Sequence, residues 1–482
     1  MYKPFIELFR TPNRNYFYEP NKNEFVEITD ESFRYLQYVF NEDADLHEMP
    51  DEVRQLMKMG YLAEKSVVEK VEHPYTKYIK TMLGRKVSKI TLQLTQKCNF
   101  RCKYCIYSES ANEHQRTHSA KEMSWETAKK CIDFLWEHSV DSRSVNVGFY
   151  GGEPLIEFPL IKKTVLYSKE KFKGKKLTFS ITSNGTLLTE EIIHFFALHD
   201  INLMISLDGP KEINDLNRVF ANGEGTFDAV MEKIKLIKKL EPEYIKNVRF
   251  SMVIDPKNDF DCINSIYLDT DTIEKWSISS TLIDTTYDEA QLDFSEDYTS
   301  KYQYHKFLAI LENFKRISDK NTSPMLQTAM QTLNHDYVTD TLSKGLFSED
   351  APGGPCIPGQ LRLFSDVDGN LFPCERVSEK SEIMHIGNID TGFNFENIVK
   401  ILNVGNLTAE MCKKCWCFKN CSICARFADD GSGNLSAAKK EQACFETRQL
   451  VYEKFYDYLV MKEIPDIYNL QLRSEEKEAV RL

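Results

Sequence analysis

The sequence predicts an α/β fold built on a parallel sheet, and two observations lead to this prediction. From residue 90 onward, short apolar or alternating runs typical of strands are each followed by a longer run with apolar residues at helical spacing. This alternation continues through six strand-like runs. Because parallel strands of one sheet are joined by right-handed crossovers, the repetition predicts a parallel sheet with a helix in most of its crossovers.

The expected strands span residues 90–94, 145–150, 177–182, 203–207, 248–254 and 276–283. The expected helices between them span residues 125–137, 160–171, 190–198 and 227–240, and a further long helix is expected over 302–317. Ligands gather at the carboxyl ends of parallel strands. Side chains that directly follow a strand are therefore the first candidates for a functional site.

The chain is long enough for about three domains at ~150 residues each. Changes in composition place their boundaries as follows: a small unit over 1–70, a largely polar linker over 71–87, the sheet domain over 88–320, a connecting region over 321–355, a cysteine-rich domain over 356–450 and a helical tail over 451–482.

Composition excludes several classes of function. The formal net charge is −12, which argues against nucleic acid as the partner. No apolar run is long enough to span a bilayer, and the first residues lack the apolar region of a signal peptide, so we expect a cytoplasmic protein with no membrane partner. In that compartment the thirteen cysteines favour metal or redox chemistry over disulfides.

Cys98, Cys102 and Cys105 follow the first expected strand in a Cx3Cx2C pattern. Three thiolates can ligate three irons of a [4Fe-4S] cluster and leave the fourth iron open. A zinc site would instead favour paired cysteines that close four ligands across a longer gap, and no fourth cysteine lies nearby. The spacing therefore favours an iron–sulfur cluster.

With the aromatic Tyr104 before its last cysteine, this pattern resembles the signature of the radical S-adenosylmethionine (SAM) enzymes. The resemblance implies a partial (β/α)6 barrel. It also implies that the open iron binds the amino and carboxylate groups of SAM. One electron from an external donor of the flavodoxin or ferredoxin type then releases a 5′-deoxyadenosyl radical.

Further residues at the strand ends resemble the SAM-binding motifs of that family. The implied cofactor-binding residues, besides Tyr104, are Gly151, Gly152, Glu153, Ser183, Asn184, Ser206, Asp208, Arg218 and Val253. Glu153 would take the SAM ammonium and Arg218 the SAM carboxylate. Each motif alone also fits a common strand-to-helix turn, and Arg218 also fits a surface salt bridge.

A second group of cysteines lies at Cys356, Cys374, Cys412, Cys415, Cys417, Cys421, Cys424 and Cys444. Their spacing resembles the SPASM domain, which holds two auxiliary [4Fe-4S] clusters. By resemblance, the distal cluster takes Cys412, Cys415, Cys421 and Cys444, and the proximal cluster takes Cys356, Cys374 and Cys424. The fourth proximal ligand is Cys417, a distant residue or nothing. By count, eight cysteines also fit two zinc sites.

Glu375 directly follows Cys374. Sulfatase maturases of this family carry an aspartate at the matching position and use it as a base, so the resemblance makes Glu375 a candidate catalytic base. A solvated surface glutamate explains the residue equally well.

Residues 1–70 read as three short strands, at 5–9, 16–18 and 25–28, followed by helices. This order resembles the winged-helix RiPP recognition element of peptide maturases, which binds a leader peptide by adding a strand to a sheet edge. A helical cap on the barrel without a ligand is the alternative.

The chain as a whole most resembles radical SAM/SPASM maturases of the sactipeptide and ranthipeptide type. The implied reaction is the formation of sulfur-to-carbon thioether crosslinks from cysteines of a ribosomally made, cysteine-rich precursor peptide that carries a leader. The alternatives are an anaerobic sulfatase-maturing enzyme that makes formylglycine, a carbon–carbon crosslinking maturase, and a zinc protein that binds peptides without catalysis.

Overall fold

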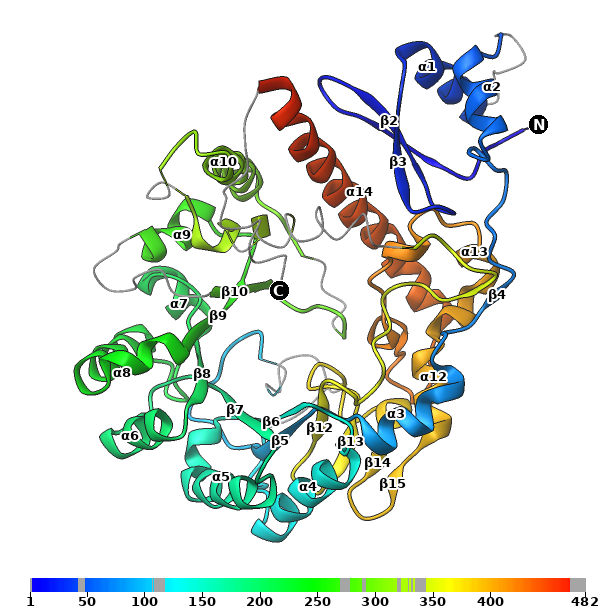
Figure 1. The fold of residues 1–482 in the computed structure, drawn as a ribbon. Coiled ribbons are helices and arrows are strands. Elements are labelled where there is room, and N and C mark those ends of the chain that lie inside the picture. The colour runs from blue at the N-terminus through cyan, green and yellow to red at the C-terminus, as the bar shows by residue number, and fades with distance from the viewer. Residues whose placement is uncertain are drawn as a thin grey trace.

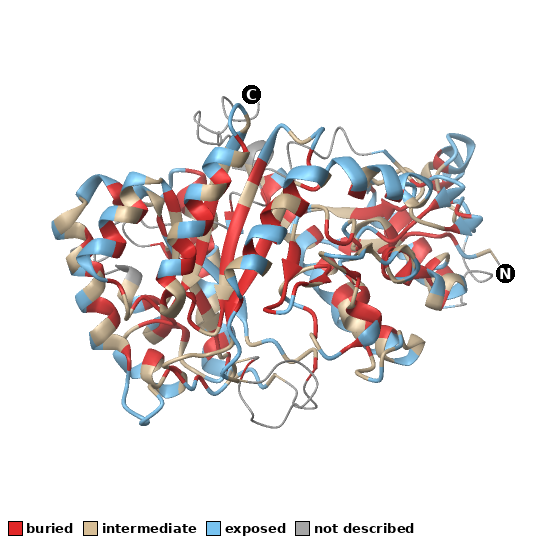
Figure 2. Ribbon diagram, turned by 90° about the horizontal axis from the view of Figure 1, so that it is seen from below, coloured by how far each residue is buried: buried red, intermediate tan, exposed pale blue. Residues whose placement is uncertain are grey.

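The computed structural model of the protein describes residues 2–41, 48–105, 107, 118–268, 278–287, 292–318, 322–327, 329–330, 333 and 344–468. The chain forms an open ring of helices around a curved sheet, with a smaller antiparallel sheet at the N-terminus (Figure 1). Strands of the central sheet are mostly buried, whereas the outer faces of its helices are exposed (Figure 2).

Six parallel strands form the barrel part of the central sheet. They are β5 (Lys89–Thr95), β6 (Ser144–Gly151), β7 (Lys176–Ser183), β8 (Ile201–Ser206), β9 (Val248–Ile254) and β10 (Ile278–Leu282). They lie side by side in chain order, each parallel to the next. Every crossover thus moves one strand further in one direction, which is how a barrel is wound. The predicted parallel sheet is confirmed.

The crossover helices are α4 (Trp125–His138), α5 (Phe158–Lys171), α6 (Glu190–Leu198), α7 (Lys211–Asn217), α8 (Phe227–Leu240) and α9 (Phe260–Leu268). Local chemistry fixes where they begin. Ser124 caps α4 by accepting a hydrogen bond from the Thr127 amide, and Thr189 caps α6 in the same way. The four predicted crossover helices are confirmed, two of them to the residue.

The sheet does not end at β5. Strand β12 (Leu363–Ser365) pairs with β5 in parallel, and β13 (Asn370–Phe372), β14 (Gly387–Asn388) and β15 (Gly392–Phe393) continue it in antiparallel pairing. Strands of two or three residues show no readable periodicity, so the sequence did not indicate this extension. The cysteine-rich region is therefore joined to the barrel by one continuous sheet.

The N-terminal unit contains β1 (Glu7–Arg10), β2 (Asn15–Glu19), β3 (Glu24–Ile28), α1 (Asp30–Phe40) and α2 (Asp51–Lys58). All of its predicted strands and helices are confirmed. Its sheet is buried on both faces because alternate side chains point in opposite directions. Phe17 and Ile28 pack in one apolar cluster with residues of α1 and α2, whereas Phe9 and Tyr18 belong to the main core.

The prediction of a polar linker over 71–87 is wrong. Helix α3 (Ile79–Arg85) occupies part of it, and β4 (Lys70–Val71) pairs with β11 (Glu349–Asp350). Ile79, Leu83 and Val87 recur at a spacing of four residues and are fully buried in the main core. Three apolar residues among many polar ones were enough to dock this segment.

The remaining helices are α10 (Glu296–Asn313), α12 (Phe395–Leu402), α13 (Ala409–Cys412) and α14 (Ala437–Tyr468). Helix α14 begins before the predicted tail and includes Cys444, so the tail and the cysteine-rich region are not separate. It runs across the molecule between the N-terminal sheet and α13 (Figure 1). None of the helices in the described residues combines the length and apolar character needed to cross a membrane.

Candidate active site at the two ends of the barrel

The loop after β5 brings the first three cysteines together. Cys102 is buried, and the Cys105 amide donates to the Cys102 carbonyl at 3.1 Å. Burial, and secondarily the neighbouring thiols, raise the pKa of both Cys98 and Cys102 to about 12. Three thiols in one short loop, of which Cys102 is buried, favour a bound cation that would hold them as thiolates.

The chain segment after α7 holds this loop in place. The amides of Arg101 and Lys103 donate to the carbonyls of Val219 and Asn217, at 2.8 and 3.0 Å. The rings of Phe100 and Phe220 meet edge to face at 5.1 Å. The segment that carries Arg218 is therefore a direct support of the cysteine loop.

Gly151 and Gly152 allow the end of β6 to pack against the same loop. Gly151 has φ +139°, and a Cβ atom there would lie 2.3 Å from the Thr95 carbonyl oxygen. A Cβ on Gly152 would lie 2.2 Å from the Lys97 carbonyl oxygen. Any larger residue would displace the loop, which explains the two glycines by close approach of two backbones.

Glu153 is fully buried beside this loop. Its carboxylate accepts hydrogen bonds from the Ser183 hydroxyl at 2.8 Å, the Asn184 amide at 2.7 Å and the Leu155 amide at 3.0 Å. Burial raises the pKa of Glu153 to about 7. Among the described residues no cation pairs with it, so its setting suits a ligand that brings a positive charge, such as an ammonium group.

Asp208, Arg218 and Tyr104 form a second buried polar group. Arg218 Nε lies 2.9 Å from Asp208 Oδ2, and the Tyr104 hydroxyl donates to the same carboxylate. The Val253 amide donates to Asp208 Oδ1 at 2.9 Å. Only 7% of Arg218 is exposed, so the alternative of a surface salt bridge is wrong. Ser206, the last residue of β8, lies at the same sheet edge.

The residues present fit a [4Fe-4S] cluster with bound SAM. A cavity of about 480 Å³ borders Cys98 and is lined by Lys97, Arg101 and His118. Three thiols, a buried carboxylate without a cation and a buried guanidinium therefore converge on one end of the barrel. Among the described residues no three acidic, histidine or cysteine side chains are arranged to hold a single metal ion.

The distal set, Cys412, Cys415, Cys421 and Cys444, gathers around a buried lysine. The thiols influence one another electrostatically. Lys440 is 1% exposed, and its Nζ donates to Cys412 Sγ at 3.4 Å and to Thr408 Oγ1 at 2.5 Å. No carboxylate among the described residues pairs with Lys440. A buried ammonium of this kind requires nearby negative charge, which thiolates of a bound metal cluster supply.

Cys417 lies with the distal set. Its thiol hydrogen-bonds to Cys415, which lowers the pKa of Cys415 and raises that of Cys417. Cys421 is its other thiol neighbour. Both of these thiol neighbours belong to the distal set, and the identity of the fourth proximal ligand stays a prediction.

The proximal set, Cys356, Cys374 and Cys424, contains three thiols. Cys356 and Cys424 each influence Cys374 electrostatically, and Cys356 is exposed. All other cysteines have their neighbours elsewhere: Cys131 donates to Ser365 at 3.3 Å in the core, and Cys262 lies near Glu212. In the described part of the chain, the thiols that influence one another in this set are these three.

The interior of the barrel, here called the lumen, is a cavity of about 740 Å³. Polar side chains on the inward positions of the strands line it, such as Thr182 and Ser251. Strand β12 pairs Leu363 with Ile90 near the start of β5, and β13 runs back antiparallel, so Cys374 lies near the amino-terminal end of the strands. The lumen thus reaches the residues that follow Cys374, because Glu375 and Arg376 are part of its lining.

Glu375 lines the lumen and forms an ion pair with Arg362. The ion pair holds the Glu375 carboxylate against the guanidinium at the wall of the cavity. The sequence did not single out Arg362, Lys89, Arg249 or Lys440. A signal was present in the strands, where the apolar residues alternate with polar or charged ones on the inward face.

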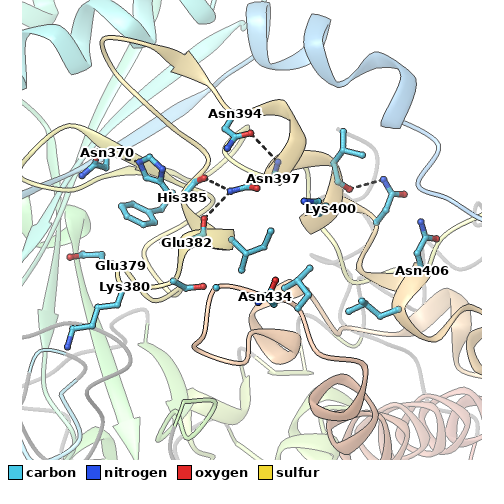
Figure 3. Close-up of a pocket in the computed structure, with 18 of the residues that line it drawn as sticks. Asn370, Glu379, Lys380, Glu382, His385, Asn394, Asn397, Lys400, Asn406 and Asn434 are labelled. Carbon is cyan, nitrogen blue, oxygen red and sulfur yellow. Dashed lines mark hydrogen bonds between the residues drawn. The ribbon is translucent and has the colours of Figure 1, made fainter.

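A further cavity of about 930 Å³ lies in the C-terminal region, away from the cysteine sets (Figure 3). It is rich in asparagines, but these already serve the fold. Asn397 Nδ2 donates to the Glu382 and His385 carbonyls, and Asn394 caps α12. We therefore place the chemistry at the lumen.

Comparison with known proteins identifies the central part of the chain. Residues 92–266 match the Radical SAM superfamily. This part of the chain is a radical SAM domain. The residues matched include the cysteine loop and the glycine, glutamate and arginine positions at the SAM end of the barrel.

The whole chain has relatives of several kinds. It is 26% identical over 376 residues to the cysteine-type anaerobic sulfatase-maturating enzyme of Clostridium perfringens strain 13, covering 75% of this chain and 93% of that protein. It is 24% identical over 264 residues to the radical SAM cyclopropyl synthase TigE of Paramaledivibacter caminithermalis, covering 50% and 54%. An uncharacterised Methanocaldococcus jannaschii protein, MJ0907, is 36% identical over 135 residues, covering 28% of this chain and 43% of its own length.

Solved structures share the fold of the radical SAM domain and its extension. Native anSMEcpe with bound AdoMet superposes with a TM-score of 0.57 at 21% identity, covering 79% of this chain and 98% of that chain. The chain thus contains a region, residues 92–266, that matches the Radical SAM superfamily, and over longer stretches it is similar to an anaerobic sulfatase-maturating enzyme and to a cyclopropyl synthase.

Proposed function

We propose that the protein is a peptide maturase that joins a cysteine sulfur of a precursor peptide to a carbon of another residue. The observation that carries this proposal is the three-thiol proximal set at one end of the lumen, opposite the SAM end. A cysteine-ligated cluster of this type has four ligand positions. The chain fills three of them with cysteine and leaves one for a substrate thiol.

The chain's own residues position the reactants. Glu153 and Arg218 are placed to bind the ammonium and carboxylate of SAM, with Tyr104 and Asp208 fixing the guanidinium. When bound, SAM and the metal clusters supply a 5′-deoxyadenosyl radical and a path for electrons. The lumen would hold two peptide side chains within reach of each other.

The proposed reaction is an oxidation. The sulfur–carbon bond forms, and one S–H and one C–H bond break. One hydrogen atom leaves to the adenosyl group, and the remaining proton and electron leave separately. Glu375, which follows Cys374 and pairs with Arg362, would receive that proton.

The N-terminal sheet is proposed to bind the leader of the precursor. Its strand order is β1-β2-β3, and no described strand pairs with the outer edge of β3. An unpaired edge offers backbone donors and acceptors to a peptide that adds as a fourth strand. This arrangement supports recognition of a ribosomally made precursor.

Oxidation of a sulfatase residue to formylglycine is the second candidate. The chain covers 93% of the length of the Clostridium perfringens sulfatase-maturating relative, which favours this candidate. The two functions make different products from a cysteine. A thioether loses two hydrogens and keeps the sulfur, whereas formylglycine loses the sulfur and gains an aldehyde.

Mass spectrometry of peptides incubated with the anaerobically reconstituted enzyme, SAM and a reductant separates the two. We expect a cysteine-containing precursor encoded beside the gene to lose two hydrogens per crosslink and to resist thiol alkylation. A cysteine-containing sulfatase peptide should remain unchanged. An aldehyde on the sulfatase peptide, with no crosslink in the precursor, would reject the maturase proposal.

A further inference from the structure

The lumen carries positive charge that nothing in the described chain neutralises. Its lining includes Lys89, Arg249, Arg362 and Arg376, but only two carboxylates, Glu375 and Asp284. Both carboxylates are already used. Glu375 pairs with Arg362, and Asp284 pairs with Arg426, which is not part of the lining.

Lys89, Arg249 and Arg376 remain, and none of these three has an ion-pair partner in the described part of the chain. Three unpaired cations in one cavity repel each other, although Arg249 and Arg376 are exposed and water screens part of this repulsion. Burial, and secondarily the Arg362 guanidinium, lower the pKa of Lys89, as expected where positive charge is uncompensated. Since the whole chain has a formal net charge of −12, this local excess does not reflect a basic protein.

The cations also share a position along the barrel. Lys89 is the first residue of β5 and Arg249 the second residue of β9, so both lie at the amino-terminal end of the strands. Arg376 follows Cys374 by two residues. The positive charge is therefore at the end of the lumen that holds the proximal set, away from Glu153 and the SAM end.

We infer that the lumen selects substrate peptides with an aspartate or glutamate side chain close to the reacting cysteine, and that Lys89, Arg249 and Arg376 bind its carboxylate. This inference rests on the proposed function in one respect, that a peptide enters the lumen. Arginine pairs with carboxylates through two parallel hydrogen bonds, so Arg249 and Arg376 give the contact direction as well as charge. Asn146 and Asn202 also lie on the lining, but their amide nitrogens already donate to the Thr178 hydroxyl and the Phe179 carbonyl, so the cations carry the contact.

The test compares two short synthetic peptides that each contain one cysteine. They differ only in having aspartate or asparagine at the positions that flank it, and both are acetylated and amidated at their ends. Binding to the SAM-loaded holoenzyme is measured by fluorescence anisotropy with the same label. We expect the aspartate peptide to bind at least about tenfold more tightly, and the ratio to fall as salt is raised.

Arg249→Gln and Arg376→Gln should each reduce that ratio toward one without changing the affinity of the asparagine peptide. Arg249→Lys and Arg376→Lys should keep most of the affinity ratio between the aspartate and asparagine peptides. A retained ratio would also show that the fold tolerates substitution at these positions. Arg143→Gln is the matched control, because Arg143 is exposed and not part of the lining. An asparagine peptide with a free C-terminus tests whether a terminal carboxylate substitutes for the side chain, and we expect it to bind weakly.

Equal binding of the two capped peptides by the native enzyme would overturn the inference. So would an aspartate preference that survives Arg249→Gln and Arg376→Gln together. The readout is affinity, so it is independent of the product formed. An aspartate preference with no thioether product would support the inference and reject the proposed reaction. Thioether formation with no aspartate preference would support the proposed reaction and reject the inference.

Discussion

The distal and proximal cysteine sets lie in the same region of the chain but differ in almost every physical respect. The distal set has four thiols, a fifth thiol at Cys417 and the buried ammonium of Lys440. The proximal set has three thiols, with Cys356 exposed. A closed site with its own counter-charge is suited to structure and electron transfer, whereas an incomplete site on a cavity is suited to a substrate.

The surroundings of the two cysteine sets also differ. Trp416, between two distal cysteines, contacts the rings of Phe9 and Tyr18 in the N-terminal sheet, at 6.3 and 6.4 Å between centroids. Asn420 Nδ2 donates to the Tyr18 hydroxyl at 3.0 Å. The proximal set instead adjoins the lumen. The two sets therefore differ in their surroundings as well as in their number of thiols.

The largest effects are expected when one cysteine is removed from each set. We expect Cys424→Ala and Cys444→Ala each to lose about four of about twelve irons, because each disrupts one cluster. Both should still cleave SAM when reduced by dithionite, since the SAM end of the barrel is intact. Only Cys424→Ala should lose the spectral change that a cysteine-containing peptide produces. A peptide-dependent change in Cys424→Ala that is absent in Cys444→Ala would exchange the roles of the two sets.

The second prediction concerns two residues at the SAM end of the barrel, whose substitution should affect SAM binding and leave the C-terminal cysteine sets intact. Glu153→Ala and Arg218→Ala should each weaken SAM binding about tenfold to hundredfold, because each removes a charge-assisted contact to the ligand. The iron content of both C-terminal sets should not change. Equilibrium dialysis with SAM and iron analysis measure the two quantities. Unchanged SAM affinity in both variants would contradict the assignment of these residues.

The third prediction concerns the counter-charge of the distal set. Lys440→Met removes a buried positive charge beside Cys412 and so disfavours the more negative, reduced state of a bound cluster. We expect the reduction potential of one cluster to fall by tens of millivolts, on the scale of about 59 mV per tenfold change for one electron. Lys439→Met on the same helix is the control and should cause little change. An equal fall in the reduction potential of every cluster would mean that the effect of Lys440→Met is not local.

The smallest effect is expected for Cys417→Ala. Because its thiol lies with Cys415 and Cys421, the substitution should leave the proximal set, and hence the product, unchanged. The distal spectrum should shift slightly as a hydrogen bond to Cys415 is lost. If the variant instead lost a cluster together with the crosslink, Cys417 would be a ligand and the proximal set would not be open.

The sequence was informative where a pattern is long or a motif is short-range. Helices such as α6 and α8 show several apolar turns, and the cysteine loop with Gly151 and Gly152 is readable within a few residues. Strand β12 was too short to show a period. The side of a turn on which Cys417 lies depends on backbone geometry that spacing does not specify.

The lumen charges illustrate a different limit. Lys89 and Arg249 look like ordinary polar residues at the start of their strands, and they are 160 residues apart. Only the closure of the sheet places them in the same cavity as Arg376. The residues of such a site are far apart in the sequence, and only the arrangement of the strands brings them together.

The double burial of the N-terminal sheet has a practical consequence for engineering. One face packs on α1 and α2, and the other on α14, where Phe9 stacks on Tyr452 at 4.5 Å and Phe25 on Tyr458 at 5.4 Å. The N-terminal unit is therefore not a detachable module. Removing residues 1–70 would expose a row of aromatic side chains and invite aggregation. A chimaera with another maturase's N-terminal unit would have to exchange the facing aromatic residues of α14 as well.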